Sequence, residues 1–365
     1  MTNDGSGSAQ MTRGKHMHAE ILSQPEVWRQ TLNAMAANPR LEEICERVTT
    51  DVEWLFIGCG SSYYIAQAAA ATFTSLGLHA RAIPASDLLL YPALVLDHRG
   101  RPQMPVLISR SGRTSEVLQA GELLEQQRGI RTIGITCSAD QPLEKLARAT
   151  FSLLAADEQS TVMTRSFTSM LFALQYLGAK VAHNAALREA LDALPAQMAG
   201  LPQEMEQKIR SFVDGHEFSD YVFLAQGPLV GIANECTLKV MESSSSYAQS
   251  FRALEFRHGP KSIVSREVLT AFLLSEDGYD AEVEMLEEVK ELGGATIAIG
   301  NRLNARAKKA ADVHIELGLS LPEIARLVAY VPCGQLLGLY TGLKKGLNPD
   351  EPRNLSRVVI LNSAV

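Results

Sequence analysis

Residues 54–62 read Trp-Leu-Phe-Ile-Gly-Cys-Gly-Ser-Ser, an apolar run followed by a glycine turn and two hydroxyl residues. The alanine-rich segment that comes next, to about Leu76, reads as a helix. A wholly apolar strand that leads through a tight turn into a helix is typical of a parallel sheet covered by helices on both faces. This stretch therefore predicts an α/β fold.

The alternation of apolar strand and helix continues along the chain in two series. In the first series we expect further strands at residues 104–109, 131–136 and 150–154. In the second we expect strands at 220–225, 268–274, 295–300 and 313–316, and a long apolar helix at about 322–345. Phe56 and Gly60 match Phe223 and Gly227 at a constant offset, which indicates duplication. We predict two α/β units, each a mostly parallel sheet between two helical layers, as in a flavodoxin-like sandwich.

This pattern divides the chain into five parts. We expect a disordered leader, lead-in helices, two α/β domains and a C-terminal tail, at residues 1–17, 18–50, 51–199, 200–345 and 346–365. The leader is small and polar, with nothing to bury. The tail contains too much proline for a helix or a central strand, so it would be ordered only by packing over something.

Composition narrows the classes of function. The 365 residues are 46% apolar and 21% charged, an ordinary balance for globular domains. A net charge of -7 argues against a nucleic-acid partner but allows a small phosphorylated substrate. The five cysteines form no CxxC pair, so neither a disulfide framework nor a metal site is indicated. No membrane span or signal-peptide core is visible, and we expect a cytoplasmic protein without metal or cofactor.

The best acid/base candidates lie near residues 235–258. Glu235, Lys239 and Glu242 are spaced i, i+4, i+7, so a helix over residues 232–242 would place them on one face. A lysine between two carboxylates can hold one of them ionised as a base. His258 is the natural proton carrier near neutral pH. The plain alternative is an exposed helix with ordinary ion pairs and a histidine that caps a turn.

Three hydroxyl-rich turns follow predicted strands. Ser61 and Ser62 begin a helix after the glycine turn, which lacks the third glycine of a dinucleotide site. Residues 109–114, Ser-Arg-Ser-Gly-Arg-Thr, offer three hydroxyls, free N–H groups around Gly112, and two guanidinium groups, of which Arg110 is one. A phosphate monoester needs such donors, although helix capping explains a single hydroxyl. The third cluster spans residues 160–166, and we expect all three turns to share one crevice at the strand carboxyl ends.

From about residue 20 to residue 357, these motifs resemble the SIS (sugar isomerase) domain family. The resemblance is to the isomerase half of glucosamine-6-phosphate synthases and to relatives that lack the glutaminase. It rests on motifs in order and spacing, at residues 58–63, 109–114, 164–168, 238–242, 256–260 and 350–355. The resemblance implies two tandem SIS domains, with the tail over the active site.

The resemblance also implies residue roles. The phosphate would be clamped by Ser109, Ser111 and Thr114. Further contacts to the sugar phosphate would come from Ser61 and Ser62. The expected binding set is completed by Arg110, Gly112, Thr164 and Arg357. Glu242 would be the base that moves a proton between C1 and C2, supported by Glu235 and Lys239. His258 would assist ring opening from the neighbouring subunit of a homodimer.

Two departures from the synthases bear on the reaction. Thr2 follows Met1 where the glutaminase nucleophile would be a cysteine, so we do not expect ammonia from glutamine. Arg357 stands where the synthases use a lysine to form an imine, and a guanidinium stays protonated. We therefore expect an amino-sugar-6-phosphate deaminase/isomerase. The alternatives are a plain aldose-ketose phosphosugar isomerase, a sugar-amine-phosphate deglycase, or, in another class, a sugar-phosphate sensor without activity.

Overall fold

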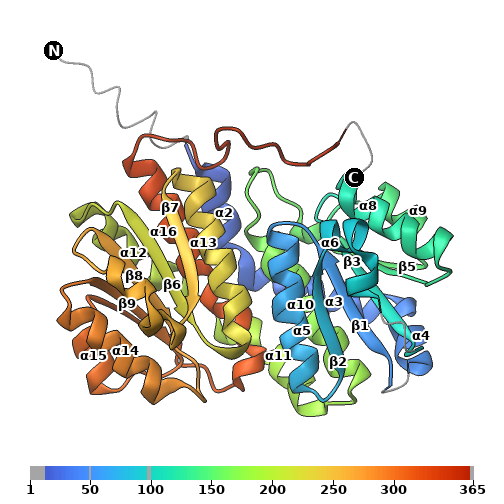
Figure 1. The fold of residues 1–365 in the computed structure, drawn as a ribbon, viewed down its shortest axis with the longest axis horizontal. Helices are drawn as coiled ribbons and strands as arrows, with labels where there is room; N and C mark the ends of the chain where they lie inside the picture. Colours follow the sequence, from blue (N-terminus) through green and yellow to red (C-terminus); the bar gives the residue numbers. More distant parts are fainter. Residues whose placement is uncertain (1–12, 49–50, 97–99, 362–365) are drawn as a thin grey trace. The chain divides into compact units, whose positions relative to one another are not determined.

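The computed structural model describes residues 13–48, 51–96 and 100–361, which group into two compact units (Figure 1). Within these limits, the first-sheet unit comprises residues 24–157, 165–196 and 356–361. The second-sheet unit comprises residues 13–23, 158–164 and 197–355. Each unit is built on one five-stranded sheet.

In the first-sheet unit the strands run in the order β2-β1-β3-β4-β5, and every pair is parallel. Their bounds are Glu53–Gly58 (β1), His79–Pro84 (β2), Gln103–Ile108 (β3), Ile133–Thr136 (β4) and Ala149–Ser152 (β5). The two faces of β1 follow the alternation of its side chains. Trp54 and Phe56 pack against Phe73 of α5 (Ser61–Ser75). Leu55 and Ile57 belong to a core that includes residues of α6 (Ala85–Leu90), α8 (Ser115–Glu122) and α9 (Pro142–Leu146).

The second-sheet unit repeats this topology strand for strand. The order is β10-β9-β8-β6-β7, again with parallel pairs throughout. The bounds are Asp220–Ala225 (β6), Tyr247–Arg252 (β7), Val268–Leu273 (β8), Ala295–Gly300 (β9) and Val313–Glu316 (β10). The predicted pair of parallel α/β units is therefore confirmed.

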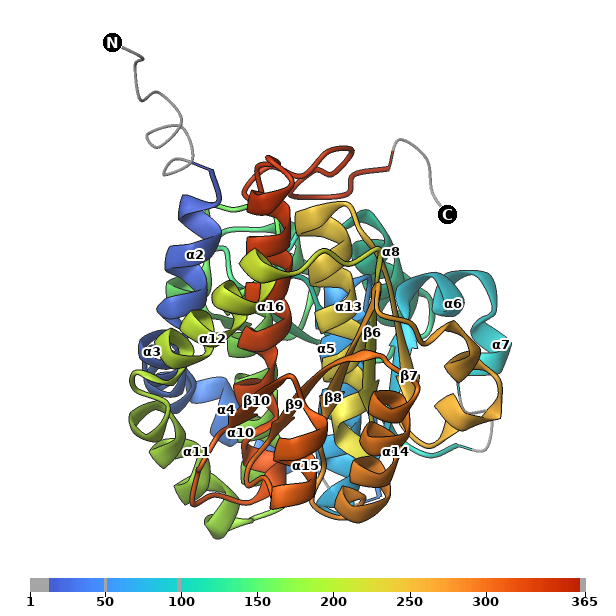
Figure 2. The same cartoon turned by 90° about the vertical axis from the view of Figure 1, so that its left-hand side faces the viewer.

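Helices cover both faces of the second sheet. On one face, α13 (Val230–Ser244) contacts β6, and the Tyr221 hydroxyl lies 3.2 Å from that of Thr341 in α16 (Leu327–Lys344). Figure 2 shows α2 (Lys15–Leu22) and α12 (Leu201–Gly215) beside α16, and contacts join all three. On the other face, Val222 and Leu224 share a core with α14 (Tyr279–Glu291) and α15 (Ala305–Ala310).

The remaining helices are shorter or lie outside these layers. They are α3 (Gln24–Ala37), α4 (Pro39–Arg47), α7 (Pro92–Val95), α10 (Arg165–Val181) and α11 (Ala185–Gln197), with a π turn at Leu123–Gln127 and several 3-10 turns. Across the described ranges, no helix combines the length and the apolarity that a membrane span requires.

Two strands are absent from the sequence analysis, and both are edge strands next to the first strand of their sheet. β2 and β7 are largely half-exposed and mix polar with apolar residues, so they lack the continuous apolar run by which the central strands are recognised. The expected leader also needs correction. Residues 15–17 belong to α2 and Met17 is buried against the fold, whereas residues 1–12 lie outside the described part of the chain.

Candidate active site

In the first-sheet unit, the turn after β3 gathers the predicted phosphate ligands. Ser109 and Thr114 hydroxyls lie 3.0 Å apart, and the Ser111 hydroxyl accepts from the Arg113 N–H. Thr114 holds the N-cap position of α8, yet its side chain makes no capping bond to the helix as described. Helix capping therefore does not account for its hydroxyl, and the first N–H groups of α8 can attract an anion.

The shape of this turn depends on Gly112. Its φ is +63°, a left-handed conformation, and a Cβ there would lie 2.7 Å from Cβ of Gln141. The Arg110 carbonyl accepts from the Thr136 hydroxyl and from Cys137 N–H at the end of β4. A larger residue at position 112 would therefore displace a turn that the neighbouring strand holds in place.

Ser61 and Ser62 lie at the carboxyl end of β1, the strand that pairs with β3 in the same sheet. Both are buried, and Gly60 at φ +53° forms the N-cap of α5 without a side-chain capping bond among the described residues. The turns after β1 and β3 thus end neighbouring parallel strands, as expected. The third turn is divided, with residues 160–164 in the second-sheet unit and residues 165 and 166 in the first, so only the first two turns lie wholly in one unit.

The end of the tail contacts the phosphate turn. The Arg110 guanidinium donates to the Arg357 carbonyl at 2.9 Å, and the Ser115 N–H donates to the Val359 carbonyl. The Arg357 side chain pairs with Asp157 at 2.5 Å, and both side chains are about half exposed. Asp157 was not singled out by the sequence, because an acidic residue in a loop carries no pattern. Residues 356–361 therefore lie over the turn that begins α8.

In the second-sheet unit, α13 brings its three charged side chains together. Nζ of Lys239 lies 2.5 Å from Oε2 of Glu242 and 3.3 Å from Oε1 of Glu235. Lys239 and Glu235 are fully buried, whereas the Glu242 side chain remains 19% exposed. The expectation of one helical face is confirmed, and the alternative of an exposed helix with ordinary ion pairs is wrong for this cluster.

Burial and charge act in opposite directions on Lys239. Burial alone lowers the pKa of its ammonium group, but Glu235 and Glu242 raise it, and the pKa ends above the ordinary lysine value. The lysine therefore stays charged at neutral pH. Glu242 is the carboxylate of this cluster that reaches the surface, and an accessible carboxylate can accept a proton.

Three glycines of α16 allow this close packing against α13. A Cβ at Gly334 would lie 2.4 Å from Cβ of Cys236, and one at Gly338 would lie 2.6 Å from the Lys239 carbonyl oxygen. At Gly342 it would lie 2.2 Å from the Ser243 carbonyl. The i, i+4, i+8 spacing puts these glycines on one stripe, so the backbone of α16 lies directly against that of α13.

His258 and Thr164 differ from the other candidates in their surroundings. His258 ends a 3-10 turn, Glu255–His258, which is anchored by the buried Phe256. His258 itself is exposed and makes no hydrogen bond within the described ranges. Thr164 is fully buried, and its N–H and hydroxyl both donate to the Glu158 carboxylate. Thr164 therefore orders its loop through Glu158, a partner that the sequence analysis did not name.

Two SIS domain matches, at residues 53–180 and 220–330, cover more than half of the chain. The chain belongs to the SIS domain family. This SIS protein is 26% identical to glutamine-fructose-6-phosphate aminotransferase (isomerizing) of Pyrobaculum aerophilum and 27% identical to that of Treponema pallidum. The alignments cover 96% and 95% of this chain but only 59% and 61% of those relatives. The chain thus spans less than two thirds of their length.

Solved structures agree with the family assignment. The SIS protein is similar to glucosamine-6-phosphate deaminase from Thermotoga maritima, with 27% identity, a TM-score of 0.77, and coverage of 94% of this chain and 99% of that one. It also shares the fold of tagatose-6-phosphate ketose/aldose isomerase from Escherichia coli, with 23% identity, a TM-score of 0.79, and coverage of 99% and 98%. The predicted family and its two tandem SIS units are confirmed.

Proposed function

We propose that this SIS protein is an amino-sugar-6-phosphate deaminase/isomerase, which converts glucosamine 6-phosphate and water to fructose 6-phosphate and ammonia. The observation that carries the proposal is the buried Lys239 bound to the accessible carboxylate of Glu242. The likeness to a glucosamine-6-phosphate deaminase, over nearly the whole of both chains, supports the substrate.

The reaction needs a base and a phosphate anchor. The hydroxyls of Ser109, Ser111 and Thr114, with the N–H groups at the start of α8, bind the 6-phosphate. Glu242 takes the C2 proton of the open-chain sugar while the aldehyde oxygen O1 takes a proton from water, which gives an enolamine with a C1–C2 double bond. Glu242 then returns its proton to C1 while the amino nitrogen loses one to water, which gives the C2 imine of the ketose; water adds to C2 and releases ammonia. Glu242 ends protonated after the first step and unprotonated after the second, so the base is regenerated.

We also propose that His258 opens the sugar ring in the active site of a partner subunit of a homodimer. An exposed histidine without a hydrogen-bond partner in the described part of its own chain supports a role outside its own unit. Arg357 forms no imine, since its guanidinium stays protonated, and its pairing with Asp157 instead supports a role in holding the tail.

The test is to incubate the purified protein with glucosamine 6-phosphate and to follow ammonia and fructose 6-phosphate together. We expect equal amounts of the two products from the wild type. Glu242→Gln should abolish turnover while leaving glucosamine 6-phosphate binding, measured by calorimetry, largely intact. Glu291→Gln, at an exposed position at the end of α14, serves as the control and should match the wild type. Formation of a ketose phosphate, without ammonia, from an aldose phosphate that lacks the amino group would instead establish a plain isomerase.

A further inference from the structure

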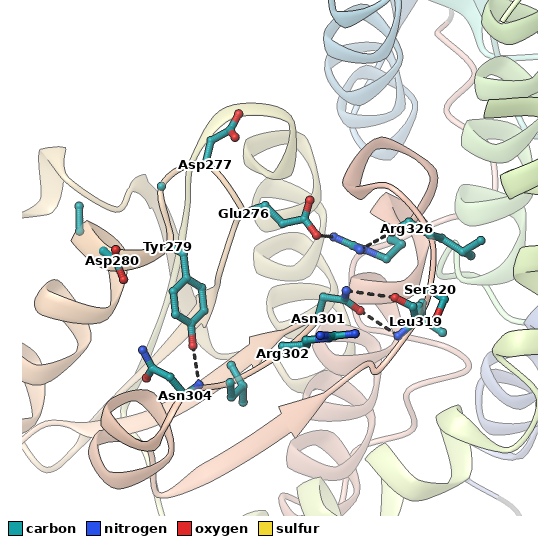
Figure 3. Close-up of a pocket in the computed structure, with 14 residues that line it drawn as sticks. Glu276, Asp277, Tyr279, Asp280, Asn301, Arg302, Asn304, Leu319, Ser320 and Arg326 are labelled. Atoms are coloured by element: carbon teal, nitrogen blue, oxygen red, sulfur yellow. Dashed lines mark hydrogen bonds and ion pairs between the residues drawn. The ribbon is translucent and has the colours of Figure 1, made fainter. Parts of the chain in front are cut away.

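A large pocket opens in the second-sheet unit, at the carboxyl ends of β8, β9 and β10. Its volume is about 1050 Å³, and Figure 3 shows the residues that line it. By the repeated topology, β8 corresponds to β3, the strand before the proposed phosphate turn. The turns after these strands also share a pattern: Ser109-Arg-Ser-Gly112 in the first unit and Ser275-Glu-Asp-Gly278 in the second. The pocket therefore occupies the duplicate of the phosphate region.

The charge of the turn is reversed in the duplicate. Residues 109–114 contain two arginines and no acid, whereas residues 275–280 contain Glu276, Asp277 and Asp280 and no cation. Asp280 lies in the first turn of α14, where the helix dipole favours an acid, but Asp277 precedes the helix and is not explained in this way. Arg302 and Arg326 also line the pocket, but its three carboxylates leave one net negative charge, which disfavours a phosphate, so this pocket does not repeat the function of the first.

The floor of the pocket holds a buried arginine. Arg326 is 1% exposed, and its guanidinium pairs with Glu276 at 2.5 Å and donates to the Leu321 carbonyl. Its Nε–H is buried without a hydrogen-bond acceptor among the residues described. A buried donor without an acceptor is costly.

The walls carry groups that recognise a polyhydroxylated molecule. Arg302 and Asp277 are exposed and form no ion pair or hydrogen bond within the described chain, and Ser320 adds a hydroxyl. Figure 3 shows the ring of Tyr279, whose hydroxyl accepts from the Asn304 N–H at 2.8 Å. Carboxylates accept from sugar hydroxyls, the guanidinium donates to them, and an aromatic ring packs against sugar C–H groups.

We propose that this pocket is a second small-molecule site, which binds an unphosphorylated amino sugar. Glu276 is paired with Arg326, and Arg302 offsets one of the two remaining carboxylates, Asp277 and Asp280, so one net negative charge is left to favour an ammonium group. The exposed Arg302 guanidinium donates to the sugar hydroxyls. The inference does not depend on the proposed reaction, because it uses none of the residues assigned to turnover.

The test uses glucosamine as the probe, titrated into the full chain by calorimetry and by amide NMR. Binding on the order of millimolar is expected, with glucose weaker. The double variant Asp277→Asn/Asp280→Asn should weaken glucosamine binding about tenfold and remove the preference over glucose. Glu291→Gln, on the same helix but outside the pocket, should bind as the wild type does.

A first-unit variant separates the two sites. Ser111→Ala should weaken glucosamine 6-phosphate binding and leave glucosamine binding unchanged. Glucosamine should change the amide chemical shifts of residues 276–280 in the wild type. This measurement needs no variant, so the test stays valid even if a variant folds poorly. The proposal is overturned if glucosamine does not bind at roughly tens of millimolar, if it binds the double variant as tightly as the wild type, or if Ser111→Ala abolishes its binding.

Discussion

Replacing Lys239 with methionine tests the charged cluster on α13 most directly. Lys239→Met keeps a long side chain of similar volume, so little cavity is created. It removes the cation 3.3 Å from the fully buried Glu235. Removing one partner of a buried ion pair typically costs about 3–5 kcal/mol, because the remaining charge must be neutralised or hydrated. We expect a loss of that size in the free energy of unfolding, measured by urea titration.

A double-mutant cycle shows whether the loss of stability comes from the unpaired Glu235. Glu235→Gln combined with Lys239→Met removes both buried partners, and this double variant should recover most of the stability that Lys239→Met loses. The pH dependence gives an independent check. Since the folded pKa of Lys239 is raised, its stabilising effect is complete below the ordinary value of 10.5 and is lost only as pH rises beyond it. The wild-type lysine therefore contributes a constant term across neutral pH, and any variation of the difference in that range comes from the Glu235 carboxyl left without its partner in Lys239→Met.

Two results would refute this reasoning. A loss below about 1 kcal/mol for Lys239→Met would mean that the cation does not compensate a buried charge. Strictly additive effects of the two single variants would mean that Glu235 and Lys239 do not interact in solution.

The other predictions concern three positions outside the ion pair. Gly338→Ala should cost about 1–3 kcal/mol, because its Cβ would meet the Lys239 carbonyl at 2.6 Å, and turnover should fall with it. Gly112→Ala should lower the free energy of unfolding more than Gly129→Ala does, and it should raise the KM for the sugar phosphate. Both glycines have positive φ, but of the two only Gly112 has neighbours within 4 Å of a Cβ. Burial raises the pKa of Glu282 from 4.5 to about 7, so its carboxyl destabilises the fold increasingly as pH rises through that range, and Glu282→Gln should gain up to about 3 kcal/mol over wild type above it.

Matched measurements decide these predictions. Gly215→Ala, at a helix end with no neighbour within 4 Å of a Cβ, should be neutral in the urea assay that reports Gly338→Ala. Equal effects of the alanine variants at Gly112 and Gly129 would contradict the close approach of the phosphate turn to its neighbour. A pH-independent difference for Glu282→Gln would contradict the raised pKa of that carboxyl.

Local pattern was sufficient to predict most of the fold. The apolar runs of β1, β3 and β6 identify buried parallel strands, because a strand covered on both faces has no polar side to show. The edge strands β2 and β7 have exposed sides, so their mixed sequence resembles a loop, and pairing with a neighbouring strand is what orders them. Met17 was likewise missed, because a short polar segment becomes a buried helix only when another part of the chain covers it.

For the site, the sequence determined which residues share a helix face or a strand-end turn, since the i, i+4, i+7 spacing of Glu235, Lys239 and Glu242 is a local property. The tertiary structure decided their environment. The glycine stripe of α16 buries Lys239 and leaves Glu242 accessible, and Glu158 takes both donors of Thr164. Burial and partner choice depend on segments far apart in the chain, and spacing along the sequence carries no information about that distance.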